Sequence, residues 1–405
     1  MTADIVIVGG GFGGLEAAFA LKALLRPSCR ITLVDRSQYH SFIPSIHLIL
    51  SGKVTADAIR IPLNVVLGAS GIRFIQDEAM SIDAAARQLI MGAGTIGYDP
   101  LLLSAGAINN FFDIPGSQQF SFRFRTPEDA EHIRSRLLQL LRDGGTPCSI
   151  VVAGAGTEGV ELIGEVLDLI SQEGHEEDLA AGRITIELIE GKSRLLPSLP
   201  PEAQDLVEEY LVRKGVRLSA GDRITEVRQD SVLLDSGVSR PASILVWSAG
   251  IQPSNLIRGL PFVKDPWGWL KVSDLLQVSD DPDVFGIGDA VSIYTGDGPL
   301  ALQRLAYHAQ DQARVAALNI AAAINGSRPV QYTPKSRPQL ISLGKDMGIL
   351  TTQERVSSGA WVVSLKKAIE RKHLLTYLTK PVSSAVWSRV PGAGMLQRLR
   401  TKLPL

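Results

Sequence analysis

The chain has 405 residues, a mean hydropathy of +0.13 and a formal net charge of −1 at pH 7. This length predicts two or three domains with a sizeable core. No apolar stretch of about 18 residues is free of charges, and no basic segment precedes the first apolar run, so we expect neither a spanning helix nor a signal peptide.

The first element with a chemical signal is a strand followed by a glycine-rich turn, at residues 4–20, DIVIVGGGFGGLEAAFA. The glycines of this turn are Gly9, Gly11 and Gly14. They permit a close approach of the backbone to a pyrophosphate, which the N-terminus of the following helix stabilises. Asp35 closes the next predicted strand, where a carboxylate accepts hydrogen bonds from a ribose hydroxyl. The pattern predicts a dinucleotide site, although glycine turns before helices also occur without one.

The middle of the chain alternates strands with helices. Residues 97–116, GYDPLLLSAGAINNFFDIPG, predict a strand that leaves the first unit, with a boundary at Pro115 and Gly116. Short β-rich runs such as SIVVAG, RITIELIE and SILVWSAG then alternate with helical stretches such as PEDAEHIRSRLLQLLRD. This alternation predicts parallel sheets with crossover helices.

A second strand, glycine turn and helix occur at residues 151–165, VVAGAGTEGVELIGE. The glycine spacing of the first turn recurs at Gly154, Gly156 and Gly159. Glu190 ends the next predicted strand after a longer gap, which predicts an inserted surface loop. An acid there favours NADH over NADPH, a preference that the nearby Lys192 and Arg194 weaken. A repeat that keeps the fold without binding a nucleotide is the alternative. Two dinucleotide sites in one chain suit a tightly held flavin and an exchangeable nicotinamide.

The last forty or so residues are basic and punctuated by prolines. From Leu365 onward, nine lysines and arginines accompany a single acid, Glu370. The stretches VSSAVWSRV and MLQRLRTKL place apolar side chains on one face of two short helices with a basic rim. Such helices suit an anionic membrane surface, with a dimer contact or a solvated helix as the alternative. No recognition motif supports binding to nucleic acid.

Several motifs occur together in chain order: IVGGGFGGLEAA, VDRSQYHSFIP, LLLSAGA, VVAGAGTEGVELIGEV, IELIEGKSRLLP, ILVWSAGI and DVFGIGDA. Over roughly residues 4–345 the chain closely resembles type II NADH:quinone oxidoreductases and the related ferroptosis-suppressor coenzyme Q reductases. The resemblance implies an α/β fold with two Rossmann-like dinucleotide-binding domains in the glutathione-reductase-like arrangement, plus a C-terminal membrane-associating segment. The expected divisions are an FAD-binding domain at 1–115 and 245–330, an NADH-binding domain at 116–244, and a C-terminal quinone, membrane and dimer region at 331–405.

The resemblance also implies cofactor contacts. Asp289 in GIGDA would bind the ribityl chain of FAD, with a helix-capping aspartate as the alternative. Pro44 would approach the isoalloxazine, although a plain loop proline fits the same pattern. The expected FAD contacts are Gly9, Gly11, Phe12, Gly14, Asp35, Arg36, Pro44, Ala105, Gly106, Gly288 and Asp289. The expected NADH contacts are Gly154, Gly156, Gly159, Glu190, Ala249 and Gly250.

Three residues are candidates for the reaction itself. Glu161, the glutamate of the second turn, is expected to relay protons from a partly desolvated position, with contact to the nicotinamide as the alternative. Tyr307 stands where type II enzymes carry the first glutamine of A-Q-x-x-x-Q and resembles the A-Y of the coenzyme Q reductases. Its alternative is simple packing against the sheet. Lys335 resembles the lysine of the family's Y-x-x-K-G segment beside the quinone, with a solvated lysine as the alternative.

The cysteines and the resemblance both bear on the electron acceptor. Cys29 and Cys148 form no C-x-x-C motif and match no redox pair of related disulfide or sulfide reductases, so we expect buried thiols and no metal site. The resemblance favours a peripheral, homodimeric FAD enzyme on the cytoplasmic face of the cell membrane that reduces menaquinone or ubiquinone with NADH and pumps no protons. The alternatives are a soluble NADH reductase of a ferredoxin- or rubredoxin-like protein and a non-catalytic, NADH-sensing flavoprotein.

Overall fold

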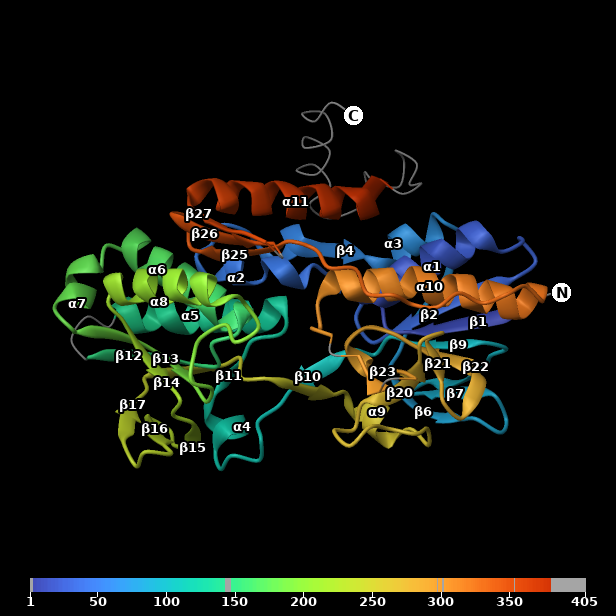
Figure 1. Ribbon diagram of the computed structural model, residues 1–405, viewed down its shortest axis with the longest axis horizontal. Helices are drawn as coiled ribbons and strands as arrows, with labels where there is room; N and C mark the ends of the chain where they lie inside the picture. Colours follow the sequence, from blue (N-terminus) through green and yellow to red (C-terminus); the bar gives the residue numbers. More distant parts are fainter. Residues whose placement is uncertain (1–2, 143–146, 297, 301, 353, 380–405) are drawn as a thin grey trace.

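The computed structural model describes residues 3–142, 147–296, 298–300, 302–352 and 354–379. Two units with separate sheets lie side by side along the long axis of the molecule (Figure 1). A C-terminal layer, made of a small sheet and the long helix α11, crosses above both (Figure 1). This arrangement confirms the predicted α/β class with two strand–helix units.

The first unit is built on a nine-stranded sheet, whose parallel part has the order β22-β9-β1-β2-β5. The parallel strands are β1 Asp4–Val8, β2 Arg30–Asp35, β5 Arg73–Gln76, β9 Leu101–Leu103 and β22 Asp281–Gly286. The sheet continues through β20 Leu270–Ser273, β21 Gln277–Val278, β23 Val291–Thr295 and β24 Gly298–Pro299. The unit therefore combines two stretches of chain that are far apart in the sequence.

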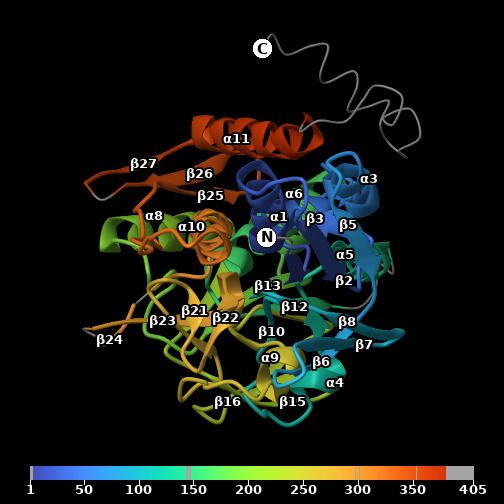
Figure 2. The ribbon, with the colours of Figure 1, turned by 90° about the vertical axis from the view of Figure 1, so that its right-hand side faces the viewer.

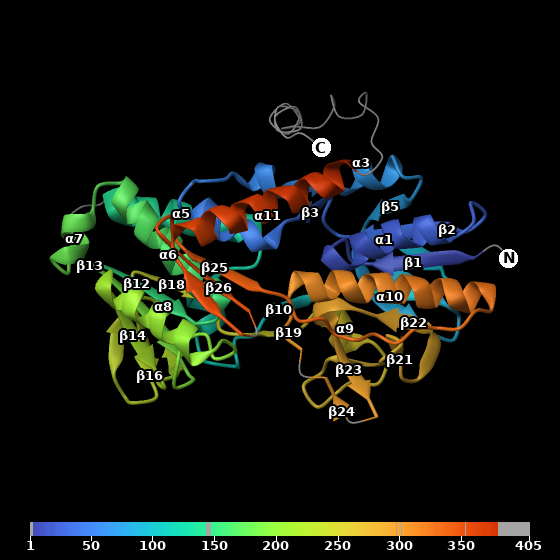
Figure 3. The same cartoon turned by 45° about the horizontal axis from the view of Figure 1, so that its top comes forward.

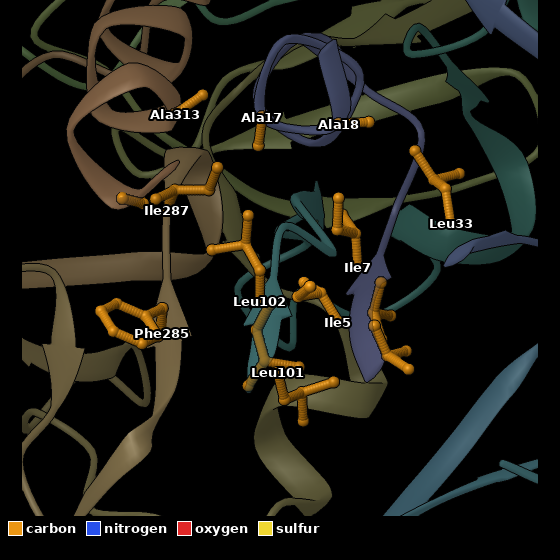
Figure 4. Packing of buried hydrophobic residues seen from close by; sticks show 14 of the residues in the cluster. Ile5, Ile7, Ala17, Ala18, Leu33, Leu101, Leu102, Phe285, Ile287 and Ala313 are labelled. Atoms are coloured by element: carbon orange, nitrogen blue, oxygen red, sulfur yellow. The ribbon is translucent and has the colours of Figure 1, made fainter. Parts of the chain in front are cut away.

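Helices α1 (Phe12–Leu24) and α10 (Ala306–Asn325) pack against each other and against this sheet. Figure 4 shows Ala17 of α1 and Ala313 of α10 close to Leu102 and Ile287, all of them buried. Each fully buried leucine or isoleucine of this core contributes about 1.5–3 kcal/mol. Small side chains at these positions let α1 and α10 approach each other closely. This packing holds α1 against the sheet, with its first residue beside the end of β1.

The second unit has a five-stranded parallel sheet of order β11-β18-β12-β13-β14. Its strands are β11 Phe122–Arg123, β12 Cys148–Ala153, β13 Ile184–Glu190, β14 Val216–Ala220 and β18 Ile244–Trp247. Its helices are α5 Pro127–Arg142, α6 Thr157–Gln172, α7 Glu176–Ala180 and α8 Pro201–Arg213. The segment that the sequence predicts as an inserted surface loop thus contains a short helix, α7. A small antiparallel sheet joins β15 Ile224–Val227, β16 Ser231–Leu234 and β17 Ser239–Pro241.

Strand β18 decides where the second unit ends. It pairs in parallel with β12, so it belongs to the second sheet, whereas the division expected at 244/245 falls inside it. The chain returns to the first unit after Trp247, through the antiparallel pair of β10 (Ala107–Asn109) and β19 (Ile251–Pro253). The chain thus leaves the first sheet after β9 through β10 and returns to it after β18 through β19.

The C-terminal layer contains β25 Gln339–Leu343, β26 Met347–Thr351, β27 Val356–Ser358 and α11 Ala360–Thr379. Helix α11 packs on β25 and β26 and is the outermost described element on that side (Figures 2 and 3). The predicted amphipathic pieces of the tail, at residues 382–403, lie outside the described residues. Within the described ranges, no helix combines the length and hydropathy needed to cross a bilayer.

Short elements complete the chain. They are β3 Tyr39–Ser41, η1 Ile43–Ser45, α2 His47–Leu50, η2 Ala56–Ile59, β4 Arg60–Pro62, α3 Leu63–Gly68, β6 Ala79–Asp83, β7 Gln88–Met91, β8 Gly94–Gly97, α4 Ser117–Phe120, α9 Asn255–Gly259 and η3 Gly288–Ala290. Of these, η1, α2 and η3 lie next to the candidate site.

Candidate active site

The first glycine turn leaves open space at the start of α1. A Cβ on Gly14 would lie 1.8 Å from the carbonyl oxygen of Gly9, so no side chain fits between the helix and the end of β1. A Cβ on Gly11, in contrast, would meet no atom within 4 Å. Asp35 fastens the turn, because its Oδ2 accepts a hydrogen bond of 2.5 Å from the amide of Gly10. Burial raises the pKa of this carboxyl, against the effect of its backbone hydrogen bonds.

The second glycine turn repeats this geometry. A Cβ on Gly159 would lie 2.0 Å from the carbonyl oxygen of Gly154, and a Cβ on Gly156 would meet no atom within 4 Å. Glu190 takes the place of the aspartate, since its Oε2 accepts a hydrogen bond of 2.8 Å from the amide of Ala155. Both acids at the ends of second strands therefore hold a glycine turn in place.

Each turn is bracketed by the end of a neighbouring strand, namely Ala105 and Gly106 after β9 and Ala249 and Gly250 after β18. A Cβ on Gly154 would lie 2.6 Å from the Cα of Ala249. Likewise, a Cβ on Gly9 would lie 2.3 Å from the carbonyl oxygen of Ser104. Gly9 and Gly154 also have φ values of +102° and +97°, which favour glycine. The structure thus brings most of the predicted backbone contacts into two matching sets.

A cleft of about 370 Å³ opens between the turn at Gly288 and the start of α10. Asp289, Trp269 and Arg304 contribute to its walls. The guanidinium of Arg304 lies 3.6 Å from the centroid of the Trp269 ring, and burial lowers the pKa of this arginine. The open helix starts at Gly11 and Gly156 suit the pyrophosphates of FAD and of a nicotinamide nucleotide, and Asp289 lies in the wall of the cleft.

Arg125 connects the two units. Its Nη1 lies 3.5 Å from Oε1 of Glu158, in the first turn of α6, and its Nη2 lies 3.6 Å from Oδ2 of Asp289. Burial raises the pKa of Glu158, and the charge of Arg125 opposes that shift. The positive charge of Arg125 therefore lies between two carboxylates, one from each unit.

The other predicted FAD contacts lie around the first turn. The ring of Phe12 meets the ring of His40 edge to face, with centroids 4.8 Å apart. Pro44 lies in η1, next to α2. Arg36 is exposed, and its Nη1 lies 3.8 Å from Oε1 of Glu78 on the surface. Their positions alone do not assign them to a ligand, and their roles stay predictions.

Glu161 lies in a buried polar network between α6, β25 and α11. Its Oε1 accepts hydrogen bonds from the amide of Ser342, at 3.0 Å, and from the ammonium of Lys366. Its Oε2 lies 3.6 Å from Nδ1 of His47. Burial, and then the charge of Lys366, hold the pKa of His47 well below its usual range, so its imidazole is neutral. One carboxylate is therefore matched by one ammonium.

Glu165, one turn further along α6, belongs to a separate ion-pair cluster. Lys53 lies 2.7 Å from its Oε2 and 2.5 Å from Oδ2 of Asp168. Burial raises the pKa of Glu165, and Lys53 opposes the shift. Glu165 therefore takes part in a salt bridge and not in the hydrogen-bonded network of Glu161.

Glu370 adds a second carboxyl to the Glu161 network, one turn after Lys366 on α11. Its Oε2 accepts a hydrogen bond of 2.9 Å from Oγ of Ser45. Its Oε1 is buried, lies 3.6 Å from Nζ of Lys366 and has no hydrogen-bond partner among the described residues. Burial raises the pKa of Glu370 to about 7, and the charge of Lys366 opposes the shift.

This pKa predicts a pH dependence of stability. The carboxyl moves from its ordinary pKa of 4.5 to about 7 on folding. Between these values the unfolded chain releases a proton that the folded chain keeps, so stability present below pH 4.5 is lost as the pH rises through 7. We expect Glu370→Gln to remove this loss, which is on the order of 3 kcal/mol.

Denaturant unfolding of the wild type and Glu370→Gln at pH 5 and pH 8 measures the effect. Glu131→Gln, at an exposed glutamate on α5, is the matched control and should follow the wild type. Parallel pH dependences for the wild type and Glu370→Gln would contradict the shift.

Tyr307, at the start of α10, is half-buried, and burial raises its pKa. The guanidinium of Arg337 lies 5.1 Å from the centroid of its ring. Asp311, one turn further along α10, pairs with Arg337 at 2.6 Å. Lys335 is exposed, and Arg337 rather than Lys335 is the cation beside the ring.

The network partners of Glu161 are residues that sequence reasoning misses. His47, Ser342 and Lys366 carry no motif, and contacts between residues so distant in the chain leave no local pattern. Glu370 carries one signal, since it is the single acid in a basic segment. A lone acid among lysines and arginines, one helical turn from Lys366, indicates a specific ion pair.

The cysteines are buried, as predicted. Cys29 lies in the core of the first unit and Cys148 in the core of the second. Burial raises the pKa of Cys148 to about 11, which disfavours the reactive thiolate. Among the described side chains, no group of three or more histidines, cysteines or acids is placed to hold a metal ion.

Comparison with known proteins places these features in a family. Residues 3–313 match the family described as pyridine nucleotide-disulphide oxidoreductase. A type II NADH:quinone oxidoreductase of Staphylococcus saprophyticus is 24% identical over 379 residues, covering 91% of this chain and 94% of its relative. The demethylphylloquinone reductase NdbB of Synechocystis is 26% identical over 360 residues, covering 86% of each chain. The structure of NDH2 from Plasmodium falciparum in complex with NADH shares the fold, with a TM-score of 0.80 at 18% identity over 96% of this chain and 99% of that one. These likenesses confirm the resemblance predicted from the motifs. The chain belongs to the pyridine nucleotide-disulphide oxidoreductase family.

Proposed function

We propose that the protein is a peripheral-membrane oxidoreductase that takes a hydride from NADH through FAD and delivers two electrons to a membrane quinone without pumping protons. The observation that carries this proposal is the duplicated turn, in which two sheets each present an open helix start and a fastening acid. Two such sites suit one bound flavin and one exchangeable nucleotide. When bound, FAD supplies the two-electron chemistry that links a hydride donor to a quinone.

The surroundings of the second turn support NADH as the reductant. Glu190 offers a carboxylate where a ribose 2′-hydroxyl would bind and a 2′-phosphate would be repelled. Arg194, a candidate phosphate ligand, is engaged by Asp205 at 2.5 Å and by Glu208 at 2.9 Å. These ion pairs make the arginine a poor partner for a phosphate.

A quinone acceptor has two sources of support. The relatives from Staphylococcus and Synechocystis are named as a quinone oxidoreductase and a demethylphylloquinone reductase. Cys29 and Cys148 are buried in separate cores, which disfavours thiol chemistry at a shared site. Tyr307 offers a hydroxyl and a ring face to menaquinone or ubiquinone. The proposed role of Glu161 is to pass protons toward the quinone, with Ser342 and Lys366 holding its carboxylate in place.

The outer face of α11 supports binding to an anionic membrane surface, and the proposal places the protein on the cytoplasmic face. Trp361, Leu365 and Ile369 recur every fourth residue and are 52%, 38% and 49% exposed. The exposed Lys372 falls on the same helical face. Apolar side chains with basic neighbours suit the interface of a bilayer. Lys366 faces inward instead, so fewer positive charges face outward than the number of basic residues in the segment suggests. The C-terminal region is also the proposed homodimer contact.

Anaerobic mixing experiments test the proposal. NADH is expected to remove the visible absorbance of the flavin, and a short-chain ubiquinone or menaquinone analogue is expected to restore it at turnover rates. Tyr307→Ala should slow the second step about tenfold and leave the first unchanged, because it removes a ring contact and a hydroxyl worth roughly 1.4 kcal/mol.

Tyr294→Ala, at a half-buried tyrosine on β23, is the matched control and should behave as the wild type. Failure of NADH to change the flavin spectrum would refute the proposal. If a ferredoxin-like protein reoxidises the flavin and no quinone does, the electron acceptor is a protein and not a quinone.

A further inference from the structure

The Glu161 network contains one carboxyl that the proposed relay does not use. Glu370 is buried on α11 beside Ser45 of η1, and its Oε1 has no hydrogen-bond partner among the described residues, although Nζ of Lys366 lies 3.6 Å away. An ionised carboxylate in this position loses its hydration, and one serine hydroxyl and an ammonium that is hydrogen-bonded to Glu161 replace it only in part. The neutral acid therefore costs less to bury than the carboxylate does. The geometry is therefore that of a carboxyl that holds a proton.

We propose that Glu370 holds, at Oε1, the proton that quinone reduction needs in addition to the one carried by the hydride, and that Ser45 orients this carboxyl. The inference rests on the proposed function and deepens it. Conversion of a quinone into a hydroquinone takes two electrons and two protons. NADH leaves as NAD⁺ after giving a hydride, which is two electrons and one proton. The second proton must come from the protein and be replaced from solvent.

Charge balance makes Glu370, rather than Glu161, the protonated member of the network. The two carboxyls share one ammonium, Lys366, and its hydrogen bond goes to Oε1 of Glu161. The amide of Ser342 donates to the same oxygen at 3.0 Å. Glu370 is left 3.6 Å from the ammonium. One cation with two acids is neutral only when one acid keeps its proton.

The remaining neighbours do not supply a second ammonium to Glu370, because Lys53 pairs with Glu165 and Asp168, and Lys367 is exposed on α11. His47 on α2, which contacts Glu161, has its pKa held well below its usual range by burial and by Lys366, so its imidazole is neutral. Ser45 in η1 donates to Oε2 at 2.9 Å, which leaves Oε1 as the oxygen that carries the proton. Burial, opposed by Lys366, raises the pKa of Glu370 to about 7, a value suited to proton transfer at neutral pH.

Ser45 also points to where the proton goes. It directly follows Pro44 in η1, the residue predicted to approach the flavin ring. The hydroxyl that orients Glu370 is therefore one residue from the proposed site of electron delivery. The carboxyl acts through this position, so we describe Glu370 as a proton-carrying residue.

Steady-state turnover of the flavin-loaded protein with two acceptors tests the inference. A short-chain ubiquinone takes up electrons and protons, whereas ferricyanide takes up electrons alone. We expect Glu370→Gln to reduce ubiquinone at least tenfold more slowly than the wild type does and to reduce ferricyanide at the wild-type rate. The wild-type ubiquinone rate should fall as the pH rises through about 7, and Glu370→Gln should lose this inflection.

Two further variants separate a proton-carrying role from a structural one. Glu370→Asp keeps a titratable group, so it should keep the inflection and recover part of the ubiquinone rate. Glu131→Gln, on the exposed face of α5, should match the wild type with both acceptors.

The outcomes separate this inference from the proposed function. A wild-type ubiquinone rate and inflection in Glu370→Gln would overturn the inference and leave the proposed function standing. An equal loss of the ubiquinone and ferricyanide rates would overturn it as well, because Glu370 would then support the fold or the hydride step. A wild type that reduces ferricyanide but no quinone would overturn both.

Discussion

Alanine at Gly14 is expected to yield protein without bound flavin. The new Cβ would lie 1.8 Å from the carbonyl oxygen of Gly9, a backbone atom that cannot move without displacing the end of β1. Overpacking of this kind costs about 3 kcal/mol or more. Because the clash separates α1 from the turn, the variant should lose both stability and the flavin. The flavin-to-protein ratio and the unfolding temperature of purified protein measure the two effects.

Gly11→Ala is the informative comparison, because its Cβ would meet no atom within 4 Å. This variant should fold with wild-type stability in the absence of flavin, yet bind FAD at least tenfold more weakly, since the methyl group enters the space that the pyrophosphate needs. Gly68→Ala, at an exposed position on α3 with no atom within 4 Å, is the neutral control. Stoichiometric flavin in Gly14→Ala would show that the turn is not the FAD site.

The second large effect is expected from Lys366→Met. The substitution leaves Glu161 and Glu370 with no ammonium, and removal of one partner from a buried ion pair costs about 3–5 kcal/mol. The methionine fills a similar volume, so the loss reports charge rather than a cavity. Denaturant unfolding at pH 7 measures it, with Lys372→Met as the control, because that lysine is exposed on the same helix.

A double-mutant cycle isolates the pair. Glu161→Gln removes the carboxylate that accepts the hydrogen bond from Lys366, so adding it to Lys366→Met should restore part of the lost stability. We expect a coupling energy of at least about 1 kcal/mol between the two sites. Additive effects of the two substitutions would mean that the ion pair does not form in solution.

The sequence predicts the fold well where its patterns are local. Both glycine turns follow a β-branched run, and each is followed by an acid at the end of the next strand. These are local patterns, and the structure has both strands in place, with Asp35 and Glu190 hydrogen-bonded to the turns. Two details differ. The segment predicted as a loop forms α7, because EEDLA is a strong helix-forming stretch with acids in its first turn. The division expected at 244/245 falls inside β18. This strand pairs with β12, which is distant in the chain, and such a pairing leaves no local pattern in the sequence.

The candidate site is only half visible in the sequence. Glu161 is identifiable because it belongs to the turn motif, but its partners come from α2, β25 and α11, and no spacing rule links them. Lys366 illustrates the difficulty: composition assigns it to a basic, solvent-facing segment, whereas packing turns it inward to Glu161. Lys335 differs from Lys366, since a family motif points to it and the structure leaves it exposed, with Arg337 beside Tyr307, so its role stays a prediction.

The position of α11 has a consequence for how the protein is made. A ribosome releases the chain from its N-terminus at about 5–20 residues per second. Glu161 is separated from Lys366 by 205 residues, so it emerges about 10–40 s before its cation does. Ser45 waits longer for Glu370, from which it is separated by 325 residues. Strands β1 to β24 and helix α10 precede α11, so both sheets are complete when the helix arrives. Both glycine turns therefore precede α11, the last described helix, on the nascent chain, and the buried partners of Glu161 are complete only when this helix packs.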